Sequence, residues 1–233
     1  MTVESPVDKR KAIIDALTGL AATRPWSEIE ITDIAQAAGV SLAEFRDVFP
    51  SKGAVLGGLS RQIDRKVLEG TTEDLAGEPA RERIFDVLMR RFDALEPYKE
   101  ALRRIFHDIQ YDPLTLAALH QVNVNSMRFM LAAAGIGTEG PLGTLKLQGA
   151  VLVYSNTIRT WLDDDDPALA KTMARLDREL RRGERVIEGA EDLRRLTAPL
   201  RAFGRALREG RRSTRRERRG SQDGDADNPA AAI

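Results

Sequence analysis

The sequence predicts an all-α protein. Along most of its 233 residues, apolar side chains recur at intervals of three and four, the spacing that gathers them on one face of a helix. No run alternates between apolar and polar residues over the length of a strand. Pro and Gly divide the chain into segments of helical length. We expect helices at residues 7–23, 32–38, 42–48, 51–74, 79–94, 97–110, 113–134, 142–162, 167–190 and 199–210.

Four Pro residues support the predicted starts of individual helices. In Asp112-Pro113 and Asp166-Pro167, a carboxylate that can cap a helix precedes a Pro at the first helical position. Glu78-Pro79 and Glu96-Pro97 are weaker versions of the same signal. These pairs place helix starts near residues 113, 167, 79 and 97.

The composition excludes several classes of protein. The chain has no Cys, which rules out disulfides, thiolate nucleophiles and thiolate metal sites. No apolar run approaches the roughly 20 residues that a membrane-spanning helix needs. The N-terminal sequence MTVESPVDKRK lacks the apolar core of a signal peptide. We therefore expect a cytoplasmic protein.

A formal net charge of zero conceals a strong charge asymmetry. Residues 194–219 hold eleven Arg and two Glu, a local net charge of +9, whereas residues 1–193 sum to −6. The first sixty residues contain six Lys or Arg and eight Asp or Glu. An acidic surface is unfavourable for binding the phosphates of a nucleic acid.

The first fifty residues predict two short helices joined by a tight turn. Thr32 is placed to cap the first of them, and Gly39 to end it in the left-handed conformation that glycine adopts easily. Val40 is expected to lie between the two helices. Ser41 and Glu44 have the spacing of a capping box at the start of the second. A helix, a four-residue turn and a second helix form the unit that places a helix in a major groove.

The segment ITDIAQAAGVSLAEFRDVFPSKGAVL resembles the helix-turn-helix of the TetR/AcrR family of transcriptional regulators. The matching residues are Thr32, Ile34, Ala35, Ala38, Gly39, Val40, Ser41, Phe49, Ser51, Lys52 and Leu56. The resemblance implies a three-helix DNA-binding unit joined to a helical domain for ligand binding and dimerisation. The expected parts are a helix-turn-helix domain at 1–50, a ligand-binding and dimerisation domain at 51–190, a basic amphipathic helix at 191–211 and a disordered tail at 212–233.

The resemblance implies a regulator, most simply a repressor, whose second short helix binds a palindromic operator. The implied DNA contacts are Thr32, Ser41, Leu42, Ala43, Glu44, Arg46, Asp47 and Lys52. However, the usual tyrosine of this helix is replaced by Arg46 and the frequent histidine by Val48, and two carboxylates lie nearby. The helix therefore either binds DNA or serves as a scaffold that no longer does.

The resemblance also implies a homodimer that forms through the helices at 142–162 and 167–190. The apolar candidates for its interface are Val151, Tyr154, Ile158, Met173 and Leu176.

A pocket for a small apolar ligand or lipid is expected in the same domain, because its large apolar side chains exceed what a thin helix pair needs. The candidates are Phe85, Leu88, Met89, Phe92, Ile105, Phe106, Met127, Phe129 and Met130. The alternative is an ordinary dry core.

Residues 145–180 are similar to the ubiquinone-biosynthesis accessory proteins, lipid binders that share the TetR fold. The similar positions are Trp161, Leu162, Asp163, Thr172, Leu176, Asp177 and Arg178. This second resemblance implies an alternative function: a lipid- or isoprenoid-binding protein with a degenerate helix-turn-helix and a membrane-binding C-terminal helix.

The segment 199–212 has one basic and one apolar face when it is drawn as a helix. The residues on these faces are Leu200, Arg201, Phe203, Arg205, Leu207, Arg208 and Arg212. Three interpretations stay open. The apolar face packs on the protein, the helix binds an anionic membrane surface, or the arginines bind nucleic acid.

Other patterns carry no chemistry. GIGTEG at 135–140 has the spacing of a dinucleotide-binding loop but follows a helix and not a strand. The consecutive carboxylates at 163–166 lack the alternate spacing of a calcium loop, and Asp166 is explained as a helix cap. His107 and His120 have no metal-ligand pattern around them. We expect no metal, no cofactor and no catalytic residue, and therefore a protein that is not an enzyme.

Overall fold

The computed structural model describes residues 6–70, 77–109, 112–140, 142–190 and 192, and within them it contains helices and no strand. The predicted all-α class is confirmed. The chain divides into two units, Met1–Ile187 and Glu188–Ile233, and only the first is described below. The residues of the basic segment lie outside the described part of the chain: Leu200, Arg201, Phe203, Arg205, Leu207, Arg208 and Arg212.

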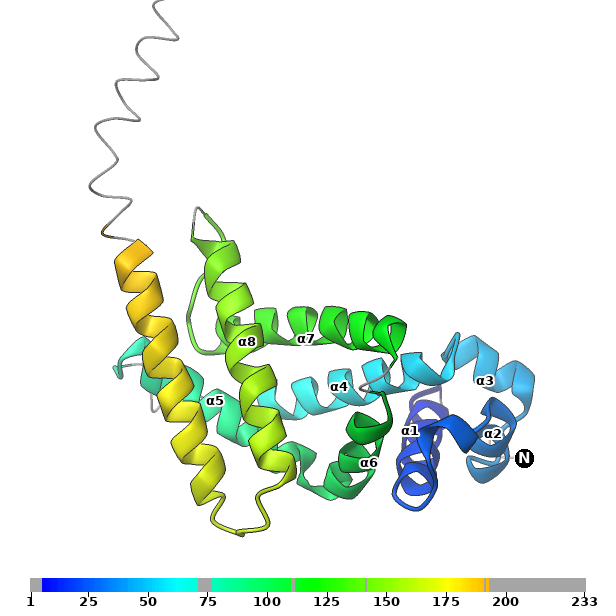
Figure 1. Cartoon of the computed structure of the whole chain (residues 1–233). Coiled ribbons are helices and arrows are strands. Elements are labelled where there is room, and N and C mark those ends of the chain that lie inside the picture. Colours follow the sequence, from blue (N-terminus) through cyan, green and yellow to red (C-terminus); the bar gives the residue numbers. More distant parts are fainter. Residues whose placement is uncertain (1–5, 71–76, 110–111, 141, 191, 193–233) are drawn as a thin grey trace, which may run out of the picture. The chain divides into compact units, whose positions relative to one another are not determined.

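Three helices form the N-terminal part of the first unit (Figure 1). They are α1 (Pro6–Ala21), α2 (Ile31–Ala37) and α3 (Leu42–Val48), and a short 3-10 helix, η1 (Trp26–Glu28), precedes α2. Ile13 and Leu17 of α1, Ile34 of α2 and Phe45 of α3 are buried together. The bounds of α3 are those that the sequence predicts, whereas η1 was not expected.

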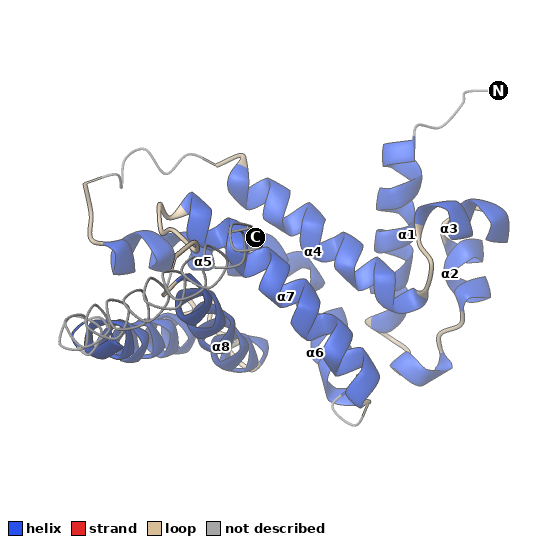
Figure 2. Ribbon diagram, turned by 90° about the horizontal axis from the view of Figure 1, so that it is seen from above, coloured by secondary structure: helices blue, strands red, loops and turns tan. Residues whose placement is uncertain are grey.

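The helix α4 (Lys52–Leu68) connects these three helices to the rest of the unit, where it lies beside α7 (Figure 2). The prediction that this helix reaches residue 74 is wrong, because it ends at its C-cap, Glu69. The helices that follow are α5 (Ala80–Leu95), η3 (Glu96–Tyr98), α6 (Lys99–Ile109), α7 (Pro113–Ala133), α8 (Gly143–Leu162) and a helical stretch at 170–187. The predicted boundary at residue 50 stays a prediction.

Stacked aromatic rings join α5 to α8. The Phe92 ring centroid lies 5.5 Å from that of Tyr154 and 5.7 Å from that of Trp161. All three side chains are almost completely buried. Rings in such offset arrangements stabilise a core beyond the apolar area that they bury, so this stack fixes α8 against α5.

The acidic turn after α8 differs from its prediction. The buried Asp164, and not Asp166, caps the next helix: its carboxylate accepts from the backbone N and Oγ1 of Thr172 at 2.9 and 2.7 Å. Burial opposes the charge of Asp164, yet the hydrogen bonds from Thr172 hold its pKa below the ordinary value. The Asp166 carboxylate accepts from the nearby Ala168 N at 3.0 Å, and the helix begins at residue 170.

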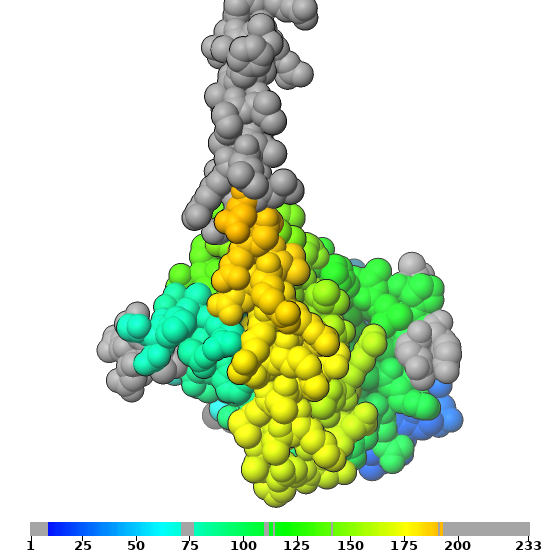
Figure 3. All heavy atoms as spheres, turned by 60° about the vertical axis from the view of Figure 1, so that its left-hand side comes forward, coloured from blue at the N-terminus to red at the C-terminus, as the bar shows by residue number. Residues whose placement is uncertain are grey.

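The helical stretch at 170–187 packs beside α8 on the face that Figure 3 shows. Asn156 Nδ2 of α8 donates to Glu179 Oε2 at 3.2 Å, and Leu176 is fully buried. Within the described residues, no helix has both the length and the hydropathy of a membrane span. The same residues include no group of three His, Asp or Glu side chains that is placed to hold a metal ion.

Candidate functional site

The turn between α2 and α3 has the geometry of a helix-turn-helix. Gly39 has a φ of +68°, a conformation that glycine adopts without steric penalty, and Val40 lies half-buried against the core. Phe45 and Phe49 anchor α3: both are buried, and their ring centroids are 6.4 Å apart. The opposite face of α3 is exposed, as it is in a helix that enters a major groove.

The predicted capping box at the start of α3 is confirmed. Ser41 Oγ accepts from Glu44 N at 3.2 Å, and Glu44 Oε2 accepts from Ser41 N at 2.8 Å. Glu44 Oε1 also accepts from Lys9 Nζ of α1 at 2.7 Å. The hydrogen bond from Lys9, followed by those from Ser41, lowers the pKa of Glu44 from 4.5 to about 2. The negative charge of Glu44 is therefore compensated within the protein.

The start of α2 corrects the predicted role of Thr32. The N-cap is Glu30, and Asp33 Oδ2 accepts from Glu30 N at 3.1 Å. Arg24 pairs with the same carboxylate at 3.1 Å. Thr32 lies inside the first turn with its side chain exposed, so it is free of the capping role and its contact with DNA stays a prediction.

The outer face of α3 is formed by Leu42, Ala43, Arg46 and Asp47, all exposed. Leu42 is 54% exposed, although it is apolar. The Arg46 side chain has no hydrogen bond or ion pair with another residue that the structure describes. Among the described residues, this face therefore presents the unpaired guanidinium of Arg46 and the carboxylate of Asp47. The carboxylate of Glu44 is paired with Lys9.

Lys52 has a structural role that the sequence did not predict. Its ammonium donates to Trp26 O at 2.6 Å and to Ile29 O at 2.8 Å, and it lies 4.3 Å from the centroid of the Trp26 ring. Burial lowers the pKa of Lys52. The side chain thus ties the start of α4 to η1, and its contact with DNA phosphate stays a prediction.

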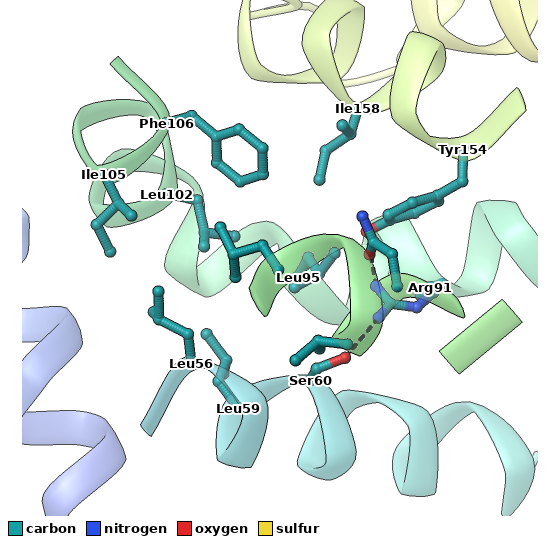
Figure 4. Close-up of a pocket in the computed structure, with 13 residues that line it drawn as sticks. Leu56, Leu59, Ser60, Arg91, Leu95, Leu102, Ile105, Phe106, Tyr154 and Ile158 are labelled. Carbon is teal, nitrogen blue, oxygen red and sulfur yellow. Dashed lines mark hydrogen bonds between the residues drawn. The ribbon is translucent and has the colours of Figure 1, made fainter. Parts of the chain in front are cut away.

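A cavity of about 60 Å³ lies among the helices of the C-terminal part (Figure 4). Its polar side consists of Ser60, Arg91, Asn123 and Tyr154. Its apolar wall consists of Leu56, Leu59, Leu95, Leu102, Ile105, Phe106, Leu119, Val122 and Ile158. A lining that is mainly apolar, with a few polar groups, has the composition of a small-molecule site, although the space is smaller than such sites usually are.

The polar side of the cavity belongs to a buried network around Arg91. The guanidinium donates to Ser126 Oγ at 3.1 Å, to the Tyr154 hydroxyl at 2.7 Å and to Ser60 Oγ at 3.0 Å. It also pairs with Asp64 at 3.1 Å, and Ser126 Oγ donates to the same carboxylate at 2.7 Å. These hydrogen bonds hold the members of the network in fixed positions.

A larger open cleft of about 1170 Å³ is lined mainly by η1, the start of α4, α6 and α7. Trp26 and Asp108 both line it, and Trp26 N donates to Asp108 Oδ2 at 2.7 Å. Leu56, Leu119 and Val122 line both the cleft and the cavity. These three side chains therefore form the partition between the two spaces.

Comparison with known proteins identifies the architecture. No family model matches the chain. The HTH-type transcriptional regulator AlkX of Mycobacterium tuberculosis is 22% identical over 167 residues, 72% of each sequence. The TetR transcriptional regulator from Nitrosomonas europaea matches with a TM-score of 0.60 and 23% identity, over 75% of this chain and 97% of that one. One from Rhodococcus sp. RHA1 matches with a TM-score of 0.56 and 19% identity, over 77% and 97%.

The chain has the TetR-regulator fold. The resemblance that the sequence shows to TetR-type regulators is confirmed, and all three relatives are named as regulators, not as enzymes. The comparisons do not favour the second resemblance, to the ubiquinone-biosynthesis accessory proteins.

Within this fold, most of the residues predicted to line a pocket do not line this cavity. Only Ile105 and Phe106 reach the cavity. Phe129 is 56% exposed. Four of the others are fully buried and two are half-buried against the core: Phe85, Leu88, Met89, Phe92, Met127 and Met130. An apolar periodicity marks a buried face, but it does not show where the packing leaves a space.

The predicted dimer contacts also need correction. Four of the five candidates are buried inside the protomer's own core, where a partner cannot reach them: Val151, Tyr154, Ile158 and Leu176. Only Met173 is exposed, at 37%. The exposed apolar side chains of the same two helices include Leu152, at 61%, and Val186, at 58%.

Sequence reasoning also missed the polar side of the cavity. Arg91, Asp64 and Ser126 come from three different helices and meet only in the fold. The available signal was weak: charged residues on the otherwise apolar faces of α4 and α5.

Proposed function

We propose that this protein is a TetR-type transcriptional regulator that binds palindromic operator DNA as a homodimer, under the control of a small ligand. The observation that carries the proposal is the position of the Glu44 carboxylate. It is held by Ser41 and Lys9, so it does not oppose the approach of phosphates. Arg46 meanwhile stands exposed on the outer face of α3, and an Arg can donate to guanine or phosphate.

Operator binding tests the proposal. Fluorescence anisotropy compares the palindromic DNA upstream of the protein's own gene with a scrambled duplex at several salt concentrations. Arg46→Ala should reduce operator affinity by about 1–3 kcal/mol if Arg46 contacts a base. Arg128→Ala, which removes an exposed arginine from α7, is the matched control and should bind normally. Equal, salt-sensitive binding of both duplexes would contradict the proposal.

The contacts of the cavity walls support ligand control. Both α4 and α6 line the cavity, and both are connected to η1, which leads into α2. Lys52 of α4 bonds the Trp26 carbonyl, and Asp108 of α6 accepts from the Trp26 amide. A ligand that separates α4 from α6 would therefore move η1 and the helix-turn-helix behind it. A shift of this kind changes operator affinity because half-sites lie at a fixed spacing.

Asp108→Ala tests this coupling. The variant should bind the operator with altered affinity and should respond less to ligand, because one of the two connections to Trp26 is absent. Asp93→Ala on α5, an exposed aspartate outside the cavity, is the control. A ligand response as large as that of the wild type would remove Asp108 from the mechanism.

The dimer in this proposal uses the exposed apolar side chains of α8 and of the stretch at 170–187. Leu152, Met173 and Val186 are exposed on these helices and are the contacts that we propose. Four helices, two from each copy, would bury these side chains between them. Such an isologous interface matches the two-fold symmetry of a palindromic operator.

A further inference from the structure

The polar side of the cavity holds hydrogen-bond donors that the protein does not use. The hydroxyl oxygens of Tyr154 and Ser60 accept from Arg91, as the dashed lines in Figure 4 show. Among the described residues, neither hydroxyl donates its own proton, and the half-buried amide of Asn123 makes no hydrogen bond. Burial raises the pKa of Tyr154, so its phenol keeps the proton. Because Tyr154 is buried and a buried donor without an acceptor is unfavourable, a ligand that brings an acceptor to its hydroxyl is favoured here.

The charge balance of the cavity limits what that acceptor is. Of the described residues that line the cavity, Arg91 alone is charged. Asp64 compensates it, and the two side chains are 3% and 11% exposed. A carboxylate in the cavity would add a second buried negative charge with no further cation beside it, which is strongly unfavourable. An uncharged oxygen needs no such compensation.

We propose that the cavity takes a small, uncharged ligand with an apolar body and one carbonyl oxygen. The inference rests on the proposed function, since it names the class of ligand that the same cavity binds. The carbonyl oxygen accepts from the Tyr154 hydroxyl and the Asn123 amide. The apolar body lies against the apolar wall of the cavity, which includes Leu95, Leu102 and Ile158.

The size of the cavity and its partition indicate how such a ligand enters. The space of about 60 Å³ is smaller than the roughly 150 Å³ cavity that holds benzene in another protein. A six-carbon ligand therefore has to displace part of the wall. Leu119 and Val122 are only half-buried and face the open cleft, so the ligand enters from the cleft by moving these two side chains of α7.

Isothermal titration calorimetry on the full chain tests the proposed class with three six-carbon probes: methyl butyl ketone, hexanoate and hexane. We expect the ketone to bind, hexane to bind about three- to tenfold more weakly for want of the hydrogen bond, and hexanoate at least about tenfold more weakly because of its charge. Hexanoate binding as tightly as the ketone would overturn the inference, as would the failure of all three probes to bind.

Two variants locate the contact. Tyr154→Phe should weaken ketone binding about three- to tenfold and leave hexane binding unchanged. Tyr98→Phe removes a hydroxyl that lies outside the cavity and accepts from Gln62, so it should bind both probes as the wild type does. Because Tyr154→Phe also takes a partner from Arg91, Asn123→Ala provides a second variant whose side chain has no bond to lose. Normal ketone affinity in both cavity variants would overturn the proposed contacts.

Operator binding, measured separately, distinguishes a failure of the proposed ligand class from a failure of the proposed regulator function. A protein that binds its operator but none of the probes would overturn the ligand class and leave the regulator intact. A protein that binds the ketone but no operator would support the ligand class and overturn the regulator.

Discussion

Gly58, in the middle of α4, is expected to tolerate no larger side chain. A Cβ at this position would lie 2.6 Å from two ring carbons of Phe49 and 3.3 Å from Ile14 Cδ1. Phe49 follows directly after α3 and is 1% exposed, so its ring cannot turn into solvent to make room. The close approach of α4 to this ring therefore holds the end of α3 in place.

Two opposing effects decide the result of Gly58→Ala. Replacing Gly by Ala inside a helix stabilises the folded protein by about 0.5–1 kcal/mol. Over-packing a dense core destabilises it by about 1–3 kcal/mol. Because the contact is far inside van der Waals distance, the second effect dominates, and we expect a net loss of about 1–2 kcal/mol. For a chain of this size, that loss lowers the Tm by about 2–8 °C.

Thermal unfolding followed by circular dichroism measures this loss, with Gly57→Ala as the matched control. A Cβ at Gly57 would lie 3.5 Å from Val122 Cγ2, an ordinary contact, so this variant should be as stable as the wild type or slightly more stable. Gly58→Ala should also bind the operator more weakly, because α3 is displaced. If both variants match or exceed the wild-type Tm, the packing argument is refuted.

Three further changes test other parts of the structure. The interactions that depress the pKa of Glu44 also stabilise the folded protein. This stabilisation is fully present above pH 4.5 and is lost as the pH falls toward 2. Glu44→Gln should therefore flatten the acid side of a pH–stability curve from urea unfolding, and an unchanged curve would count against the Lys9 pair. Lys52→Met should lower the free energy of unfolding by roughly 1–3 kcal/mol, because two carbonyls lose their donor; an unchanged Tm would argue against this tie. Leu152→Asp should give a monomer in light scattering, whereas Leu116→Asp on α7 should not, and a persistent Leu152→Asp dimer would place the interface elsewhere.

The features that the sequence determined are those that depend on neighbours a few residues away. The bounds of α3, its capping box and the left-handed Gly39 were predicted correctly, because each rests on hydrogen bonds or dihedral angles within about four residues. The cap of the helix after α8 could not be predicted from neighbouring residues in this way. Both Asp164 and Asp166 lie close enough along the chain to cap this helix. Asp164 caps it because the folded chain buries that carboxylate beside Thr172.

The tertiary structure decided which apolar faces are covered and which charges are compensated. Periodicity marked Tyr154 and Ile158 as apolar-face residues of α8, but the chain's own helices cover that face and leave Leu152 exposed on the other. Glu44 was visible in the sequence as an acidic residue on a helix expected to meet DNA. Its partner, Lys9, lies 35 positions away, and only the packing of α1 against α3 brings that ammonium within 2.7 Å of the carboxylate. Electrostatic interactions depend on distance in space, which the order of residues alone does not give.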